Sequence, residues 1–385
     1  MAFAKSLSKL AANVNSESGA TLTVDLAAIA ANWRELVRRL RSVECGAVVK
    51  ANAYGLGLEP VTGALARAGC RTFFVADLAE ARRARAAARD AVIYVLNGFA
   101  AESATAFIET GARPVINAAT ELAEWEAFAI KHDWRGGAAL QVDTGMNRLG
   151  ISGADAAAIA SRAESDNRGI ALVMSHLACA EIPDHPLTTA QIRRFGEVRA
   201  LFPKIPASLA NSAGIFLGDA AHCALARPGA ALYGLNPTPQ RPNPMHNVVE
   251  LTGRILQLRT VERGDTVGYG ATWTAKRTTR LAVAALGYAD GIPRAKTGDA
   301  AGAHKAYIAG QQCPFAGRIS MDLVCLDITD LPEGAARRGD PVTCIGAEIP
   351  VDAVAASAGT IGYEILTRLG SRCRVVYRGL RDGNA

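Results

Sequence analysis

A lysine at the end of an apolar run is the first residue in this sequence that could do chemistry. Lys50 follows Gly46-Ala47-Val48-Val49, and the chain continues through the small residues of Ala51-Asn52-Ala53-Tyr54-Gly55-Leu56-Gly57. A strand ending here would present the amine at a sheet edge with little bulk beside it. Burial favours the neutral form of a lysine, which can react with a carbonyl group. A solvated lysine is the commoner case at a strand end, but this setting favours a covalently held pyridoxal 5'-phosphate.

Eight short apolar runs alternate with alanine-rich amphipathic stretches between residues 46 and 235, which is typical of a parallel sheet covered by helices. Most runs end on a polar residue, and eight such strands close a (β/α)8 TIM-type barrel with its chemistry at their carboxyl ends. The sequence therefore predicts an α/β fold of this kind. Strands are expected at residues 46–50, 72–77, 91–97, 113–117, 138–143, 170–176, 208–211 and 226–233, and helices at 26–41, 59–68, 78–89, 119–132, 154–163 and 188–202.

The pattern changes after Asn236-Pro237, in a segment that holds four prolines before His246 ends it. Beyond it apolar residues alternate with period two, as in Val249-Leu251-Gly253-Ile255, and helical patterns almost vanish. We expect an extension at residues 1–20, a barrel domain at 21–240 and a mainly β domain at 241–385. The extended residues 21–25 precede the barrel strands, so they are expected to pair with the β domain.

Composition is that of an ordinary globular protein. The 385 residues carry a net charge of +6, with no long basic run and no apolar stretch of about 18 residues, so we expect neither nucleic-acid binding nor a membrane span. The eight cysteines form no C-x-x-C pair and mostly lie among apolar residues, which favours reduced thiols. The N-terminus lacks a secretory pattern, so the cytoplasm is the expected location. No metal-ligand spacing is present.

The segment around Lys50, Val48 to Gly57, resembles the cofactor-lysine motif of alanine racemases, which use pyridoxal 5'-phosphate. Eight further motifs of that family recur in family order, so the resemblance runs from about Leu22 along the whole chain. Each alone would be weak, but together they are specific. They are Asp143-Thr144-Gly145-Met146-Asn147-Arg148-Leu149-Gly150, Ser175-His176-Leu177-Ala178, Asn211-Ser212-Ala213, Arg227-Pro228-Gly229-Ala230-Ala231-Leu232-Tyr233-Gly234, Gly268-Tyr269-Gly270-Ala271-Thr272-Trp273, Gly287-Tyr288-Ala289-Asp290-Gly291, Gly317-Arg318-Ile319-Ser320-Met321-Asp322 and Ile361-Gly362-Tyr363-Glu364.

The resemblance implies that Lys50 binds the cofactor and serves as one base in interconverting L- and D-alanine, with D-alanine supplied for peptidoglycan. It also implies a head-to-tail homodimer in which Tyr269 of one subunit is the second base in the other subunit's site. Racemisation removes a proton from one face of the substrate Cα and returns one to the other, so two flanking groups suit it. A phenol is a weak base at neutral pH, and Arg148 and His176 are the expected sources of the positive charge it needs.

The resemblance also assigns supporting roles. Arg227 is expected to face the pyridine nitrogen of the cofactor, and an arginine that stays protonated would keep that nitrogen unprotonated. Arg148 and the backbone N–H of Met321 are expected to contact the substrate carboxylate. Other cofactor contacts are expected at Tyr54, His176, Asn211, Ser212, Gly229, Ala230 and Tyr363, and the entryway at Tyr288 and Arg294 with Asp322 in support.

One position departs from the family. Many members carry a lysine seven residues before the arginine equivalent to Arg148, modified to a carbamate whose charge orients that arginine, and here the position is Gln141. A neutral amide supplies no charge, so we hypothesise that Arg148 recruits an anion such as chloride. Ser320 is a milder difference, since some relatives have cysteine there.

Three other functions fit part of the pattern. A racemase of broader substrate range would carry the same motifs, because they do not report pocket size. A non-catalytic barrel protein that binds the same cofactor shares the lysine strand but lacks a β domain, so the Tyr269 and Met321 segments disfavour it. A decarboxylase with this cofactor shares the two-domain plan, but related decarboxylases generally have a cysteine in the role of Tyr269.

Overall fold

The structure is a computed structural model that describes residues 18–163, 169–294, 305–370 and 372–379. The chain divides into two compact units. The barrel unit is Leu26–His246, and the β unit combines Met1–Asp25 with Asn247–Ala385. The barrel unit extends beyond the predicted boundary at residue 240, because the Asn32 side chain donates to the backbone oxygen of His246 at 3.0 Å and accepts from its N–H at 2.7 Å. These bonds tie the proline-rich segment to the barrel.

Seven parallel strands of the barrel unit form one sheet, in the order in which they occur along the chain. Most of their side chains are buried, because helices cover one face of a barrel wall and packed side chains fill the other. The strands are β3 (Ala47–Val48), β4 (Thr72–Val75), β5 (Val92–Val95), β6 (Arg113–Ile116), β7 (Ala138–Gln141), β8 (Ile170–Met174) and β9 (Ala207–Ser208).

A short second sheet closes the ring. β10 (Leu225–Ala226) pairs in parallel with β2 (Glu44–Cys45), and β2 leads through Gly46 into β3. On its other side, the chain after β10 pairs with the chain after β9, since the Arg227 N–H donates to the Ala210 oxygen at 2.8 Å. Backbone hydrogen bonds therefore continue around the ring, and the predicted (β/α)8 TIM-type barrel is confirmed.

The predicted eighth strand, residues 226–233, is wrong beyond Ala226. Pro228 has no N–H to donate to a strand ladder. Residues Ala230–Tyr233 form a 3-10 helix, η3, which ends at Gly234 with φ 82°. The chain stays beside β3 through Pro228, whose oxygen accepts from the Val48 N–H at 2.8 Å, and then turns into η3.

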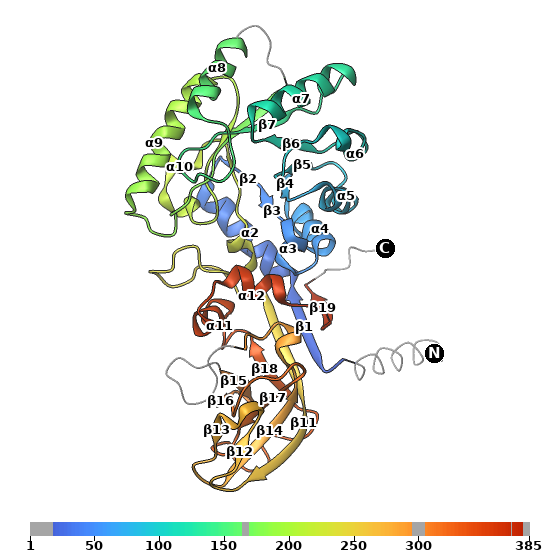
Figure 1. Ribbon diagram of the computed structural model, residues 1–385, viewed down its shortest axis with the longest axis vertical. Coiled ribbons are helices and arrows are strands. Elements are labelled where there is room, and N and C mark those ends of the chain that lie inside the picture. Colours follow the sequence, from blue (N-terminus) through green and yellow to red (C-terminus); the bar gives the residue numbers. More distant parts are fainter. Residues whose placement is uncertain (1–17, 164–168, 295–304, 371, 380–385) are drawn as a thin grey trace, which may run out of the picture. The chain divides into compact units, whose positions relative to one another are not determined.

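Helices follow the strands and surround the parallel sheet (Figure 1). In α2 the buried residues Ile29, Trp33, Leu36 and Leu40 recur every three or four positions, as expected for one apolar face. Within the described residues, no helix combines the length and apolarity that a membrane span requires. The helices of the unit are α2 (Leu26–Leu40), α3 (Lys50–Tyr54), α4 (Leu58–Ala68), α5 (Leu78–Ala87), α6 (Ala104–Thr110), α7 (Ala119–Lys131), α8 (Gly153–Ala163), α9 (Pro186–Leu201) and α10 (Asp219–His222).

An eight-stranded sheet forms the β unit, in the order β16-β15-β18-β11-β1-β19, with β14 paired to β11 and β17 paired to β14. The strand expected at residues 21–25 lies in this sheet, where β1 is antiparallel to β11 and parallel to β19. The strands of the unit are β1 (Ala20–Asp25), β11 (Val249–Val261), β12 (Thr266–Val267), β13 (Trp273–Thr274), β14 (Thr279–Ala285), β15 (Lys305–Ile308), β16 (Gln311–Pro314), β17 (Leu323–Asp327), β18 (Pro341–Ile345) and β19 (Arg374–Arg378).

The predicted mainly β domain is confirmed, although it also contains two short helices. The β unit contains α11 (Val351–Ala358) and α12 (Gly362–Arg368). Pro350 precedes α11, and Gly359 ends it with φ 71°, which is the usual glycine stop signal. These two short helices lie between β18 and β19 in the chain.

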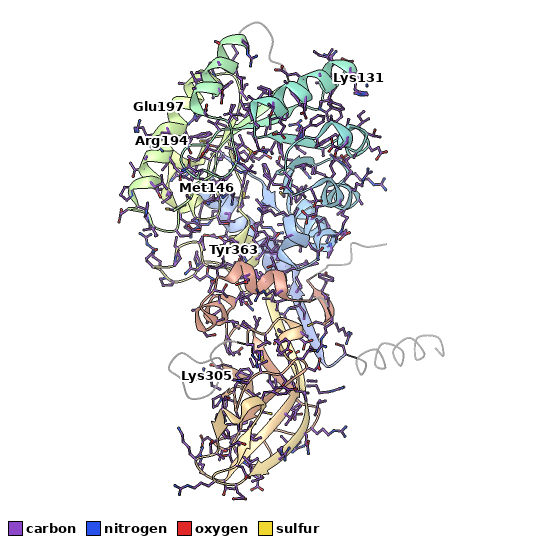
Figure 2. All side chains as sticks on the ribbon, in the orientation of Figure 1. Lys131, Met146, Arg194, Glu197, Lys305 and Tyr363 are labelled. Atoms are coloured by element: carbon purple, nitrogen blue, oxygen red, sulfur yellow. The ribbon has the colours of Figure 1, made fainter. Side chains whose placement is uncertain are left out.

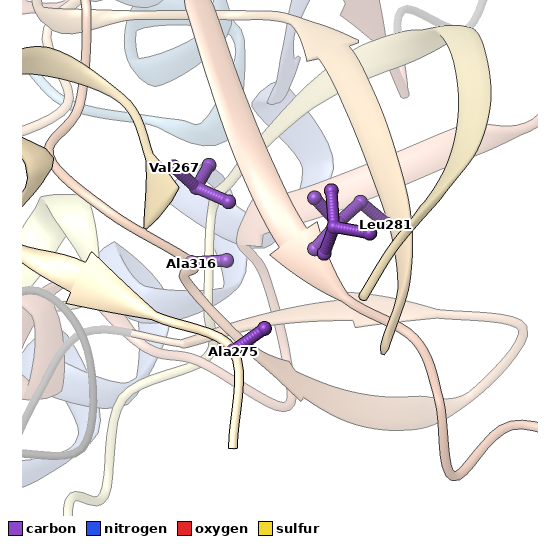
Figure 3. Close-up of a cluster of buried hydrophobic side chains, with 5 residues drawn as sticks. Val267, Ala275, Leu281 and Ala316 are labelled. Carbon is purple, nitrogen blue, oxygen red and sulfur yellow. The ribbon is translucent and has the colours of Figure 1, made fainter. Parts of the chain in front are cut away.

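A small apolar cluster supports the hairpin formed by β12 and β13. Val267 and Ala275 from the hairpin pack with Leu281 of β14 and with Ala316, as Figure 3 shows, and Val261 completes the cluster. Trp273 packs against the same group. The cluster fixes the base of the hairpin, whose tip carries Tyr269.

All eight cysteines are free thiols. Burial raises the pKa of both Cys70 and Cys344 to about 12. Thiols that stay protonated react slowly with oxidants and metals, so these cysteines serve as small apolar packing groups.

Candidate functional site

The barrel brings its predicted site residues to the carboxyl ends of its strands. Lys50 lies two residues beyond β3, His176 two residues beyond β8, and Arg227 directly after β10. The carboxyl ends of parallel barrel strands share one face. The charges of Arg227, Arg148 and Lys50 all act on His176, so these three side chains form a cationic cluster around the imidazole.

The amine of Lys50 lies where its charged form is disfavoured. The side chain is half-buried. Burial lowers the pKa of Lys50 and the positive charge of Arg148 lowers it further, while Glu80 acts in the opposite direction. More of the amine is therefore neutral near physiological pH than in an exposed lysine, and the neutral form is the nucleophile and base.

Two stacked tyrosines lie beside the strand that carries Lys50. The rings of Tyr54 and Tyr233 have centroids 4.5 Å apart and planes inclined by 29°. The Tyr233 hydroxyl donates to the Val48 oxygen at 2.9 Å. Tyr233 thus fixes the end of β3, and its stacking fixes the Tyr54 ring.

An unusual turn follows Lys50. The four residues 51–54 all have φ of 54° or 55°, in the left-handed region that costs residues with a side chain roughly 1–2 kcal/mol each. The Gly55 N–H donates to the Ala51 oxygen at 2.8 Å, which closes the turn. Strain of this kind persists only where the surrounding structure holds it, and it is concentrated at functional sites.

Arg227 is a buried cation, with 4% of its surface exposed. Its guanidinium donates to the Ser208 hydroxyl and to the Ser175 backbone oxygen. It also lies over the Phe74 ring, 5.9 Å from the centroid. Burial lowers the pKa of Arg227 to about 10, so the group still carries its charge at neutral pH.

His176 is held neutral. Burial lowers its pKa to about 3, and the charges of Arg227, Arg148 and Lys50 act in the same direction. A neutral imidazole has one N–H donor and one acceptor nitrogen. His176 can therefore stack on or hydrogen-bond to a ring, but the expectation that it supplies positive charge for Tyr269 is wrong, because a neutral imidazole adds no charge to the site.

Ser212 gathers backbone donors beside Tyr54. Its hydroxyl oxygen accepts from the Gly229 N–H at 3.0 Å and from the Ala231 N–H at 3.1 Å, which leaves the hydroxyl hydrogen free to donate. A Cβ at position 229 would lie 2.3 Å from the Tyr54 hydroxyl oxygen, so only glycine fits. The Ser212 and Tyr54 hydroxyls both lie beside the Gly229 backbone, two residues after Arg227, and these donors fit a phosphate.

Other predicted residues have structural partners. The Asn211 side chain accepts from the Gly214 N–H at 2.9 Å and donates to the Leu177 oxygen at 3.4 Å. Ala230 is buried at the start of η3. Both residues shape the loops around Ser212.

The β unit holds the other predicted residues. Tyr269 begins the 3-10 turn Tyr269–Ala271 between β12 and β13, and the residue is 66% exposed. Gly268 and Gly270 flank it with φ of 78° and 73°, which only glycine adopts without strain. Tyr363 lies in the first turn of α12 (Figure 2) and is 38% exposed.

An ion pair between Arg372 and the buried Asp290 holds the two loops that carry Tyr288 and Met321. Asp290 accepts from Arg372 at 2.9 Å, and a second Arg372 nitrogen donates to Asp322 at 2.6 Å. The Ala289 N–H also donates to the Met321 oxygen at 3.1 Å. The charged partner of Asp322 is therefore Arg372, a residue that the sequence motifs did not single out.

Gln141 lies near Arg148 and hydrogen-bonds to the loop that carries this arginine. Its side-chain amide donates to the Leu149 backbone oxygen at 3.1 Å. The interaction fixes the residue next to Arg148 but brings no negative charge to its guanidinium. Arg148 itself is exposed, and it is the cation that most lowers the pKa of Lys50.

Sequence reasoning missed residues that hold the predicted ones in place. Gln191 of α9 is fully buried, accepts from the Ala178 N–H at 2.9 Å and donates to the His176 backbone oxygen at 2.9 Å. No spacing marks it, because its partners are two backbone groups and the Thr144 hydroxyl, which lies 47 residues away. Ala231 lies within the motif that runs from Arg227 to Gly234. Its N–H donates to the same Ser212 hydroxyl oxygen that accepts from Gly229.

Family comparison covers most of the chain. The family described as alanine racemase, N-terminal domain, matches residues 24–237. The family described as alanine racemase, C-terminal domain, matches residues 248–377.

Similar proteins carry the same description. An alanine racemase from Methylobacterium nodulans is 54% identical over 357 residues, which are 93% of this chain and 95% of that protein. A catabolic alanine racemase from Mesorhizobium japonicum is 47% identical over 366 residues, which are 94% of each chain. The crystal structure of alanine racemase from Bartonella henselae with covalently bound pyridoxal phosphate has a TM-score of 0.87 and 38% identity, covering 94% of this chain and 99% of that chain.

Proposed function

The chain belongs to the alanine racemase family and is an isomerase, and from that premise we propose that it interconverts L-alanine and D-alanine by a two-base mechanism with pyridoxal 5'-phosphate as cofactor. The observation that carries the proposal is the half-buried Lys50 amine, which lies at a strand end among cations that lower its pKa. Such an amine can hold an aldehyde covalently and can accept a proton.

Each end of the cofactor would have its own donors. The hydroxyls of Tyr54 and Ser212 and the backbone at Gly229 and Ala230 would bind the phosphate, and Arg227 would face the ring nitrogen. When bound, the cofactor draws electron density from the substrate Cα–H bond. A protonated Arg227 would limit that withdrawal, which suits a reaction that must return the proton. The proposed cofactor contacts are Lys50, Tyr54, His176, Asn211, Ser212, Arg227, Gly229, Ala230 and Tyr363.

Proton movement would be shared between two groups. The Lys50 amine would take the proton from one face of the substrate Cα, and the Tyr269 hydroxyl would deliver one to the other face. In the reverse direction the roles exchange. Arg148 and the Met321 N–H would hold the substrate carboxylate, so that Cα stays between the two groups.

Tyr269 would come from the second subunit of a homodimer. In support, 66% of Tyr269 and 52% of Met321 are exposed in the single chain. Aromatic side chains and methionine are enriched at protein–protein interfaces relative to the rest of the surface. A dimer would cover them and complete each barrel site with residues of the neighbouring chain.

We place the enzyme in the cytoplasm, where it would supply D-alanine for peptidoglycan. A bacterial source strain that lacks the gene, and any second racemase gene, should then need D-alanine for growth. Growth without D-alanine would contradict the biosynthetic role while leaving the chemistry intact.

Isotope exchange tests the chemistry directly. Protein with pyridoxal 5'-phosphate and L-alanine in heavy water should lose the substrate Cα proton signal while optical rotation decays to zero. The Lys50→Ala variant is the control and should show neither change. Exchange with full retention of rotation would contradict the two-base mechanism, and the absence of both changes in the wild-type protein would contradict the racemase assignment.

A further inference from the structure

The left-handed turn at residues 51–54 is held by a glutamate on the next helix. Glu80 of α5 accepts from the Asn52 N–H with one carboxylate oxygen, at 2.8 Å, and from the Ala76 N–H with the other, at 2.9 Å. Hydrogen bonds to an ionised carboxylate are stronger than neutral ones. One half-buried side chain therefore joins the turn after Lys50 to the end of β4.

Asn52 is fixed from its side chain as well. Its Oδ1 accepts from Arg83 at 2.7 Å and from the Leu58 N–H at 3.1 Å. Arg83 in turn binds Glu59 through two bonds of 2.6 Å. Glu80 and Arg83 are three residues apart on α5, so one face of this helix restrains both the backbone and the side chain of Asn52.

We propose that Glu80 is a positioning residue for Lys50, because its carboxylate holds the left-handed turn against the end of β4 and so fixes where the Lys50 amine points. The inference deepens the proposed function and rests on it. A turn with four residues in a strained conformation would relax without such a restraint, and Lys50 begins that turn. Glu80 also contributes charge, since its carboxylate, unlike the nearby cation Arg148, favours a protonated Lys50 nitrogen.

The barrel contains a matched control. Glu121 has the same place in α7 that Glu80 has in α5, the third residue of the helix. It accepts from the N–H four residues earlier, that of Asn117, at 2.6 Å, and from the Phe99 N–H in the loop after β5. Both glutamates are half-buried. Glu121 therefore reproduces the bridge at a corner that carries no predicted site residue.

The test compares Glu80→Gln and Glu121→Gln as holoenzymes. A glutamine has one acceptor oxygen and no charge, so each variant loses part of its bridge, and we expect similar falls in melting temperature. Only Glu80→Gln should change the visible circular dichroism of the cofactor held by Lys50. Only this variant should also shift the midpoint of the pH titration of that band to lower pH. Only Glu80→Gln should lower kcat, by about 10- to 100-fold, because small misplacements of a reacting group have effects of that size.

A shorter carboxylate separates geometry from charge. Glu80→Asp keeps the charge but lacks the reach to bridge both amides, so the dichroism and kcat should change while the pH midpoint stays near that of the wild type. This variant also serves if Glu80→Gln does not fold.

Two results would overturn the inference. One is unchanged dichroism and kcat in the Glu80 variants despite lowered melting temperatures, which would leave Glu80 with a purely structural role. The other is an equal spectral change in Glu121→Gln. Failure of the proposed function would look different, because the wild-type protein itself would then lack the visible band or the racemase activity.

Discussion

The two units present their predicted site residues in opposite ways. In the barrel unit Arg227 and Ser212 are buried, and the charges of the strand-end residues shift one another's protonation. In the β unit Tyr269 and Met321 are mostly exposed. In the barrel unit, charged side chains of the same chain set one another's protonation. In the β unit, the predicted site residues lie on the surface of the chain.

This contrast teaches that burial separates two kinds of site residue. Groups that must have an altered pKa lie where water is excluded, because only there do charge and desolvation act strongly. In the proposed dimer, groups that complete the other chain's site must remain reachable until that chain binds. Barrel variants should therefore abolish chemistry in their own chain, and β-unit variants should act on the neighbour's site.

The largest effect is expected for Lys50→Ala. The visible absorbance of the bound cofactor should disappear, and the racemisation rate should fall by about 10⁴-fold or more, because covalent attachment and one base are lost together. Absorbance spectra and polarimetry measure the two effects. Lys131→Ala and Lys305→Ala remove exposed amines (Figure 2) and should leave both unchanged. A surviving visible band in Lys50→Ala would assign the cofactor to another lysine.

Mixing variant subunits tests the contrast between the units. Tyr269→Phe should slow racemisation by about 10²–10⁴-fold and should impair Cα proton exchange unequally for the D and L enantiomers, because one enantiomer needs the phenol as base and the other needs it as acid. Unfolding and refolding it together with Lys50→Ala should restore about a quarter of wild-type activity, since half the dimers are mixed and each mixed dimer has one intact site. Activity that stays at the level of the single variants would show that both residues act within one chain.

Acid should weaken the barrel through His176. The folded-state pKa of His176 is about 3, below the ordinary value near 6.5, so in that window the unfolded chain binds a proton that the folded chain does not. Stability is therefore lost as pH falls from about 6.5 to about 3. The urea midpoint of His176→Gln should fall less between about pH 7 and pH 4 than that of the wild type. His132→Gln, with an exposed ring, should follow the wild type, and parallel curves for all three proteins would contradict the assignment.

The smallest effect is expected from halide. If an anion compensates for Gln141 beside Arg148, the KM for alanine should be a few-fold lower in chloride than in gluconate at equal ionic strength, which holds screening constant. The Gln141→Lys variant should reduce the difference. Identical KM values in the two salts would dismiss the anion hypothesis.

Periodicity and motifs in the sequence were enough to place most of the barrel and its candidate site. The predicted helix at residues 119–132 is α7, and the predicted strand at residues 170–176 contains β8, because each buries one continuous set of apolar side chains. Lys50 and Arg227 could be singled out because they end such strands within recognisable motifs. Patterns of this kind depend only on residues close together in the sequence.

What the sequence could not reveal depends on distant partners. Nothing near Glu80 indicates that its carboxylate reaches Asn52, which lies 28 residues away. The left-handed turn is equally hidden, because alanine in isolation disfavours it. Arg372 looks like an ordinary basic residue in the sequence, yet it binds the buried Asp290 across 82 residues.

The place of β1 has a consequence for how the protein is made. This strand lies between β11 and β19, so the ribosome releases it long before either neighbour exists. The whole barrel can assemble while β1 waits unpaired, and the sheet closes only when β19 emerges. Nascent chains halted before β11 should therefore contain a protease-resistant barrel and a protease-sensitive β1.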